Sequence, residues 1–156
     1  MEIERKFLLP ELPVDVAEAP STHLRQGYLA IGPHDEVRIR DAGGVFTLTA
    51  KSGAGIEREE SETEITRAQF EALWASTEGR RIEKRRHLLA EGDVTYEVDV
   101  FEGSLQGLLL AEVEFHSLDE ARSFEPPAWF GPEVTHDIGY SNAALAVRGL
   151  RGGTPA

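Results

Sequence analysis

Charged and apolar residues alternate in six segments of the chain, which is the pattern of β-strands whose two faces meet different surroundings. Near the N-terminus, Glu2, Glu4 and Lys6 fall on one face of such a strand, and Ile3 and Phe7 fall on the other. The other alternating segments are residues 37–40, 46–51, 62–64, 96–101 and 111–115. Further strands are predicted at residues 23–31 and 82–89, so about eight strands are expected.

Clusters of glycine, proline and aspartate separate the predicted strands and mark turns between them. These clusters fall at residues 32–35, 41–44, 91–93 and 103–107. Because such connections are short, we expect consecutive strands to pair with each other in an antiparallel manner.

Helical spacing and capping residues predict three short helices. The first follows Thr66, where Gln69 occupies the capping-box position and apolar residues then recur at helical spacing. The second is expected to start at Ser117 and the third at Ser141 or Asn142. Their apolar stripes would cover the apolar faces of the strands.

The length of 156 residues is one that a single hydrophobic core supports, so we expect one domain over residues 1–150 and a flexible tail at 151–156. The net charge of −12 argues against a nucleic-acid partner. No apolar run approaches the roughly 20 residues of a membrane-spanning helix. The chain has no cysteine and its N-terminus lacks an apolar signal stretch, which favours a cytoplasmic location.

The basic residues are thirteen arginines and three lysines, and all three lysines, Lys6, Lys51 and Lys84, fall on the charged faces of predicted strands. A sheet with one solvated face is the ordinary explanation for any single strand of this kind. A solvated face usually mixes its polar residues, however, whereas here carboxylates gather on some strands and cations on others. If the strands close into a barrel, the charged faces can point inward only when something neutralises and hydrates them.

Inward-facing cations would bind a polyanion, because lysine and arginine donate hydrogen bonds to phosphate oxygens. The candidate substrate-binding residues are Lys6, Arg38, Arg40, Lys51, Lys84 and Arg86. Inward-facing carboxylates would repel the same polyanion unless hard divalent cations lie between them. The candidate metal ligands are Glu2, Glu4, Glu62, Glu64, Asp99, Glu112 and Glu114. The two sets together indicate metal-dependent phosphate chemistry.

The segment Glu2-Ile3-Glu4-Arg5-Lys6 resembles the Glu-x-Glu-x-Lys signature of the CYTH superfamily, the triphosphate tunnel metalloenzymes. The resemblance continues, in the same order, through residues 26–29, 37–40, 48–51, 62–64, 84–86, 97–101 and 111–114. It implies a mainly β (α+β) fold, a closed eight-stranded antiparallel β-barrel with a few helices packed outside and at the C-terminus. It also implies one or two Mg²⁺ or Mn²⁺ ions inside the barrel.

The resemblance implies roles for individual residues. Glu2, Glu4, Glu112 and Glu114 lead the predicted metal ligands, with Asp99, Glu62 and Glu64 as further ligands or as residues that position water. The predicted catalytic residues are Glu4, Lys6, Tyr28 and Lys51. Tyr28 is expected either to accept a proton, which requires nearby cations to lower its pKa, or to be hydrogen-bonded as part of the barrel wall.

The predicted function is therefore divalent-metal-dependent hydrolysis of inorganic triphosphate or another short polyphosphate, a small-molecule substrate. Adenylate cyclase, thiamine triphosphatase and nucleoside triphosphatase activities of the same superfamily are alternatives, but they need a site for an organic group and no aromatic pocket is predicted. A non-catalytic polyphosphate-binding module is a further alternative, and such a module would tend to lose the metal-binding carboxylates. Nothing in the sequence predicts the oligomeric state.

Two smaller observations complete the prediction. Gly139 precedes Tyr140-Ser141-Asn142, where members of the superfamily often carry a basic residue, and this leaves the preferred substrate length open. The five histidines show no metal-ligand spacing and are assigned to no site.

Overall fold

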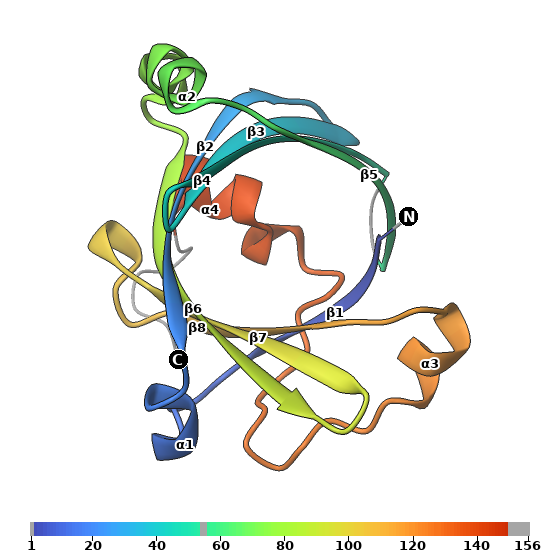
Figure 1. Ribbon diagram of the computed structural model, residues 1–156. Helices are drawn as coiled ribbons and strands as arrows, with labels where there is room; N and C mark the ends of the chain where they lie inside the picture. The colour runs from blue at the N-terminus through green and yellow to red at the C-terminus, as the bar shows by residue number, and fades with distance from the viewer. Residues whose placement is uncertain (1, 54–55, 150–156) are drawn as a thin grey trace.

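Eight antiparallel strands close into a barrel in the computed structural model, which describes residues 2–53 and 56–149 (Figure 1). The strands are β1 (Glu2–Leu8), β2 (Ser21–Ile31), β3 (Asp35–Ala42), β4 (Val45–Ser52), β5 (Glu57–Glu64), β6 (Arg81–Glu91), β7 (Val94–Phe101) and β8 (Leu109–Glu114). The predicted eight-stranded antiparallel barrel is thus confirmed. The predicted tail at residues 151–156 lies outside the described residues.

The order of strands around the barrel is β1-β5-β4-β3-β2-β6-β7-β8, so the prediction of consecutive pairing is wrong at two places. Strand β1 pairs with β5 and β8 rather than with β2, and β2 pairs with β6. The physical reason is closure: the first strand fills the gap between β5 and β8, which would otherwise be two exposed edges. The hairpins β2–β3, β3–β4, β4–β5, β6–β7 and β7–β8 pair as expected.

The register of the strands sends the charged faces into the barrel. Lys6 lies opposite Glu112, and Arg86 lies opposite Asp99. The alternate residues point outward, where Phe7, Val98 and Val113 are buried in the largest apolar cluster of the molecule. Because side chains alternate strictly along a strand, one register defines both the charged interior and the apolar exterior.

Two helices cover the outside of the barrel as predicted. Helix α2 (Arg67–Trp74) starts with the full capping box of Thr66 and Gln69, and it buries Phe70 against Phe46 of the barrel wall. Helix α3 (Leu118–Ser123) is capped by Ser117, whose side chain accepts from the Glu120 backbone N–H. A third outer helix, α1 (Val14–Ala17), was not predicted, because four residues are too few to show a helical period.

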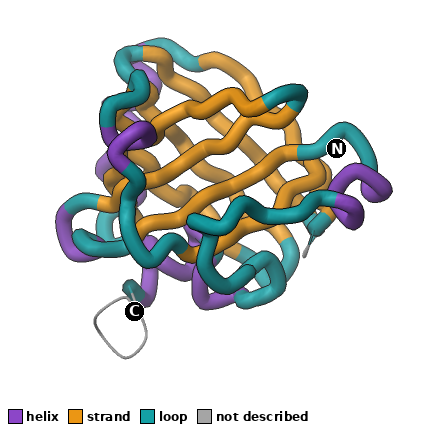
Figure 2. Tube along the Cα trace, turned by 90° about the horizontal axis from the view of Figure 1, so that it is seen from below, coloured by secondary structure: helices purple, strands orange, loops and turns teal. Residues whose placement is uncertain are grey.

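Seen along the barrel, the C-terminal helix α4 (Asn142–Arg148) lies across the opening of the ring of strands rather than against its outer wall (Figure 1). Its Leu145 is buried in one cluster with Ile82, Phe101 and Leu110 of the barrel. The inward face of the strands is therefore apolar at this end, and α4 closes it. Figure 2, turned by 90°, shows the strands forming the body of the molecule with helices at its periphery. Within residues 2–53 and 56–149, no helix is long and apolar enough to cross a membrane.

Candidate active site

Three charged side chains form the deepest polar layer, next to the apolar end that α4 closes. Lys84 and Asp99 are completely buried, and Lys84 Nζ lies 2.6 Å from Asp99 Oδ2. Arg86 binds the same carboxylate at two points, Nε to Oδ1 at 2.7 Å and Nη2 to Oδ2 at 2.8 Å. Its Nη1 donates to Glu97 Oε2 at 2.7 Å. Burial lowers the pKa of Lys84 to about 8, and Asp99 opposes this shift. These contacts hold two cations rigidly at the bottom of the site.

Glu112 stands one layer above, between two cations. Lys6 Nζ lies 3.6 Å from Glu112 Oε1, and Arg86 Nη2 lies 3.5 Å from Glu112 Oε2. Burial alone would raise the pKa of Glu112, but Lys6 and Arg86 hold it well below its usual range. Glu112 is therefore ionised at neutral pH.

Glu4 is a carboxyl group whose ionised form is strongly disfavoured by its surroundings. Burial raises its pKa to about 8, and the negative charge of Glu112 adds to this effect. The pKa of the neighbouring Glu2 is also raised, first by burial and then by a hydrogen bond shared with Glu60. Lys51, whose Nζ lies 2.9 Å from Glu2 Oε1, opposes this shift. Protein cations thus neutralise the buried carboxylates Glu2 and Glu4 only in part. A divalent cation beside them would stabilise their ionised forms.

The facing wall, on β2 and β3, is cationic. Arg40 Nε donates to Gln26 Oε1 at 2.8 Å, and Gln26 Nε2 donates to the Tyr28 hydroxyl at 2.8 Å. Arg38 is buried, and its Nε has no hydrogen-bond partner among the described residues. Burial and the nearby Arg38 lower the pKa of Arg40 to about 10. Two crowded guanidinium groups with free donors form a ready site for an anion.

Burial raises the pKa of Tyr28 to about 12, even though Arg38 opposes the shift. The phenol is therefore protonated at neutral pH. This environment favours a hydrogen-bonding role for Tyr28 over the role of proton acceptor.

Strand β5 contributes a more open part of the wall. Thr49 Oγ1 donates to Glu62 Oε1 at 3.0 Å, so Glu62 lies on the interior side of β5. Glu62, Glu64 and Glu114 are all exposed, and Glu114 lies opposite Glu4 in the β1–β8 register. Glu2, Glu4, Asp99 and Glu112 are thus the more enclosed members of the predicted metal-ligand set, and Glu62, Glu64 and Glu114 are the outer members.

Four further residues of the barrel interior were not among the predicted site residues. Glu97 binds Arg86, Gln26 links Arg40 to Tyr28, and Glu36 Oε1 pairs with Arg58 Nη2 at 3.0 Å. A signal was present for three of them, because Glu97, Gln26 and Glu36 lie two residues from Asp99, Tyr28 and Arg38 and so share their faces.

A cavity of about 740 Å³ opens onto this interior. Glu4, Lys6 and Arg58 belong to its inner wall, and its outer wall comes from residues 29–36, residues 134–138 and one side of α4. The site therefore has both a charged interior and a route from solvent.

The enclosed carboxylates fit a divalent cation. Mg²⁺ and Mn²⁺ prefer carboxylate oxygens, and Glu2, Glu4 and Glu112 supply them beside a cationic wall. Asp99 fits less well as a ligand, because both its oxygens are already engaged by Lys84 and Arg86.

The family model of the CYTH domain matches residues 1–149, so the chain belongs to the CYTH family. Membership implies a divalent metal. An inorganic triphosphatase of Nitrosomonas europaea is 49% identical over 150 residues, which cover 94% of this chain and 97% of that protein. An inorganic triphosphatase of Acetivibrio thermocellus is 37% identical over 146 residues, which cover 92% of each. The crystal structure of an inorganic triphosphatase matches with a TM-score of 0.70 at 46% identity, covering 94% of this chain and 95% of the other.

Proposed function

We propose that this chain hydrolyses inorganic triphosphate to orthophosphate and pyrophosphate inside its barrel, in the presence of Mg²⁺ or Mn²⁺. The observation that carries the proposal is that enclosed carboxylates and a wall of buried cations face one interior. Similarity to two inorganic triphosphatases supports the same substrate.

The cations would hold the phosphate chain. Arg38 and Arg40 offer guanidinium donors from β3, Lys84 and Arg86 offer charge from the deepest layer, and Lys6 lies between Glu112 and the cavity. These groups would neutralise the charge on the non-bridging oxygens as the bridging P–O bond breaks. Because buried ion pairs with Asp99 hold Lys84 and Arg86 in place, these two cations need little reorganisation when the substrate arrives.

The enclosed carboxylates Glu2, Glu4 and Glu112 would hold the metal, with Glu62, Glu64 and Glu114 further out as ligands or as groups that position its water molecules. The bound metal would neutralise phosphate oxygens and lower the pKa of coordinated water. Asp99 would instead serve to position Lys84 and Arg86.

The reaction needs a water molecule that attacks the terminal phosphorus. Its oxygen forms the new P–O bond, the bridging P–O bond breaks, and pyrophosphate leaves with the electron pair of that bond. Glu4, whose pKa burial and Glu112 raise to about 8, would orient this water and, in its ionised form, take its proton. Tyr28 would stay a phenol and donate a hydrogen bond.

A naked phosphate chain suits the cavity better than a substrate with an organic ring. Among the described residues, those that line the cavity include no phenylalanine, tyrosine or tryptophan. Aromatic groups gather on the outside instead, for example Phe7, Tyr96 and Phe130. Without an aromatic surface to stack on, a nucleobase or thiazole ring would gain little in this cavity.

A substrate panel tests the proposal. Inorganic triphosphate, longer polyphosphate, ATP and thiamine triphosphate would each be incubated with Mg²⁺, Mn²⁺ or chelator, and phosphate, pyrophosphate and cyclic AMP would be quantified. We expect the highest kcat/KM for inorganic triphosphate. Cyclic AMP as the main product would instead identify a cyclase, and binding without turnover would identify a binding module. The cytoplasmic location stays a prediction.

A further inference from the structure

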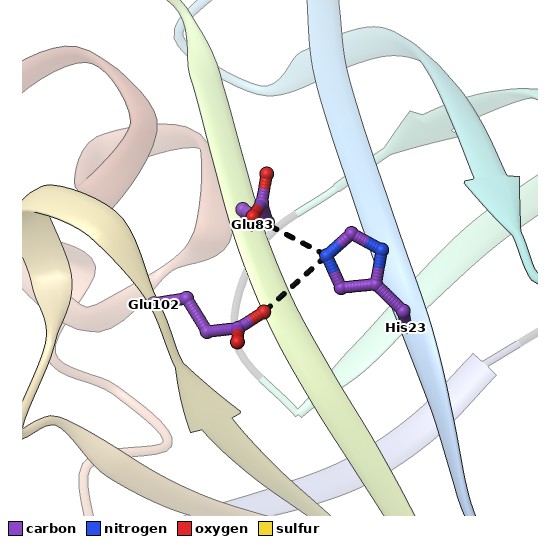
Figure 3. A group of neighbouring side chains, drawn as sticks. All are labelled: His23, Glu83 and Glu102. Carbon is purple, nitrogen blue, oxygen red and sulfur yellow. Dashed lines mark ion pairs between the residues drawn. The ribbon is translucent and has the colours of Figure 1, made fainter.

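His23, Glu83 and Glu102 form a cluster on the outside of the barrel, away from the charged interior (Figure 3). His23 Nε2 lies 3.3 Å from Glu83 Oε1 and 3.3 Å from Glu102 Oε1. The three ligand atoms all lie within 4.8 Å of one another. Their residues are far apart in sequence, so the fold alone creates this cluster.

The barrel backbone positions the three side chains. His23 is on β2 and Glu83 is on the neighbouring β6, where the β2–β6 register places His23 opposite Arg85. Glu102 follows β7, and its backbone N–H donates to the Glu83 carbonyl at 2.9 Å. Two adjacent strands, β2 and β6, and the segment after β7 thus present one ligand each, and backbone hydrogen bonds already hold these segments in place.

The nearby arginines do not neutralise these carboxylates. Arg25 lies opposite Glu83 in the register, yet its Nη2 pairs with Asp41 Oδ2 at 2.8 Å and its guanidinium lies over the Trp74 ring. Arg85 turns to Ser21 instead, at 3.3 Å. Within residues 2–53 and 56–149, His23 is the sole basic side chain within 4.0 Å of either glutamate.

One carboxylate oxygen of the cluster is buried and accepts no hydrogen bond from the described residues. This oxygen is Glu102 Oε1, the atom nearest to His23. A buried carboxylate oxygen that accepts no hydrogen bond has lost its hydration without compensation, and a bound cation would compensate for that loss.

The spacing and the donor types favour a first-row transition ion. Around a tetrahedral ion with bonds of about 2.0–2.1 Å, neighbouring ligand atoms lie about 3.3–3.4 Å apart, which is the separation of His23 Nε2 from each glutamate oxygen. An imidazole nitrogen suits Zn²⁺ and similar ions, whereas Mg²⁺ prefers oxygen alone. The side chains are 39%, 51% and 40% exposed, so water can complete the coordination shell.

We propose that His23, Glu83 and Glu102 form a second metal site, separate from the barrel interior, that binds Zn²⁺ or a similar divalent transition ion. The ion would link β2, β6 and the segment after β7 from outside. Because Glu83 is adjacent to Lys84, the link would also stabilise the strand that carries the deepest cations of the interior. This inference does not depend on the proposed function.

The test is a Zn²⁺ titration followed by NMR of the histidine side chains, in which the His23→Gln variant identifies the His23 signals. In the native chain, the His23 signals should shift and saturate with Zn²⁺, and the unfolding temperature should rise. The variants Glu83→Gln and Glu102→Gln should each weaken this binding by at least about tenfold, since even outer-shell changes at metal sites cost about that much.

Glu71→Gln and His116→Gln are matched controls, because both residues are exposed and belong to no ion pair among the described residues. Both should bind Zn²⁺ at His23 as the native chain does. Native His23 signals that do not respond to millimolar Zn²⁺ would overturn the proposal. So would a response that is equally strong in Glu83→Gln and Glu102→Gln, since the ion would then bind the histidine alone.

Discussion

Lys51 Nζ lies 2.9 Å and 3.2 Å from the two carboxylate oxygens of Glu2, across strand β5, which separates their two strands in the barrel. Both side chains are nearly buried, so the pair links β4 to β1 inside the barrel. A cation in this position neutralises a candidate metal ligand and would also face the proposed substrate.

The variant Lys51→Ala should lose about 100-fold or more in kcat/KM for triphosphate, because one preorganised charge that stabilises the transition state is removed. The fold should persist, because the backbone pairing of β4 with β3 and β5 does not involve the Lys51 side chain, and circular dichroism would check this. Lys51→Arg is the control, and it should retain more activity because it keeps the charge. A rate equal to that of the native chain in Lys51→Ala would remove Lys51 from the site.

Tyr28→Phe tests whether the buried phenol transfers a proton. Burial raises its pKa to about 12, so we expect a hydrogen-bonding role and a loss of less than about tenfold in kcat. Steady-state kinetics over a range of pH would measure this. A loss of about 100-fold or more, with the basic limb of the pH profile abolished, would instead identify Tyr28 as the proton acceptor.

Helix α4, which closes the apolar end of the barrel, should contribute to stability through Leu145, which is buried against Ile82, Phe101 and Leu110. Leu145→Ala should lower the free energy of unfolding by about 2–5 kcal/mol, because it leaves a cavity in this cluster. Val147→Ala on the same helix is the control, because Val147 is 51% exposed and should change stability by less than about 0.5 kcal/mol. Equal effects in denaturant unfolding would show that α4 does not pack as described.

Glu133 should make stability depend on pH. Arg5 donates to both its oxygens, at 2.9 Å and 2.7 Å, and these hydrogen bonds lower the pKa of Glu133 in the folded state. Its contribution is therefore present above the unfolded pKa of about 4.3 and is lost as the pH falls through the lower folded pKa. Because the Glu133 side chain is 35% exposed, the contribution should be about 1 kcal/mol or less.

Denaturant unfolding of Glu133→Gln and of the native chain measures this contribution. The difference in free energy of unfolding should be largest near neutral pH and should shrink below about pH 4. Glu125→Gln is the control, because Glu125 is exposed and has no ion pair among the described residues. A difference that stays constant down to acid pH would contradict the assigned role of the Arg5–Glu133 pair.

Much of this arrangement was predictable from residues that are close in sequence. Alternation in β1 is enough to place Glu2, Glu4 and Lys6 on one face, and the capping box of Thr66 and Gln69 marks the start of α2. These features depend on neighbours within a few residues, where the period of the side chains is fixed by the backbone.

What was missed depends on contacts between distant segments. The pairing of β1 with β8 joins residues more than a hundred positions apart, so no local pattern reveals it. The cluster of His23, Glu83 and Glu102 has the same origin, because no short spacing in the sequence brings an imidazole to two carboxylates. The individual roles proposed for Glu4, Lys6 and the other interior residues stay predictions.

The most direct test of the central claim is ³¹P NMR of inorganic triphosphate mixed with the purified chain, first with Mg²⁺ or Mn²⁺ and then with excess chelator. We predict that orthophosphate and pyrophosphate appear in equal amounts with metal and that turnover stops when the metal is removed. Continued hydrolysis in excess chelator would contradict metal dependence, and an unchanged triphosphate spectrum with both metals would contradict the triphosphatase activity.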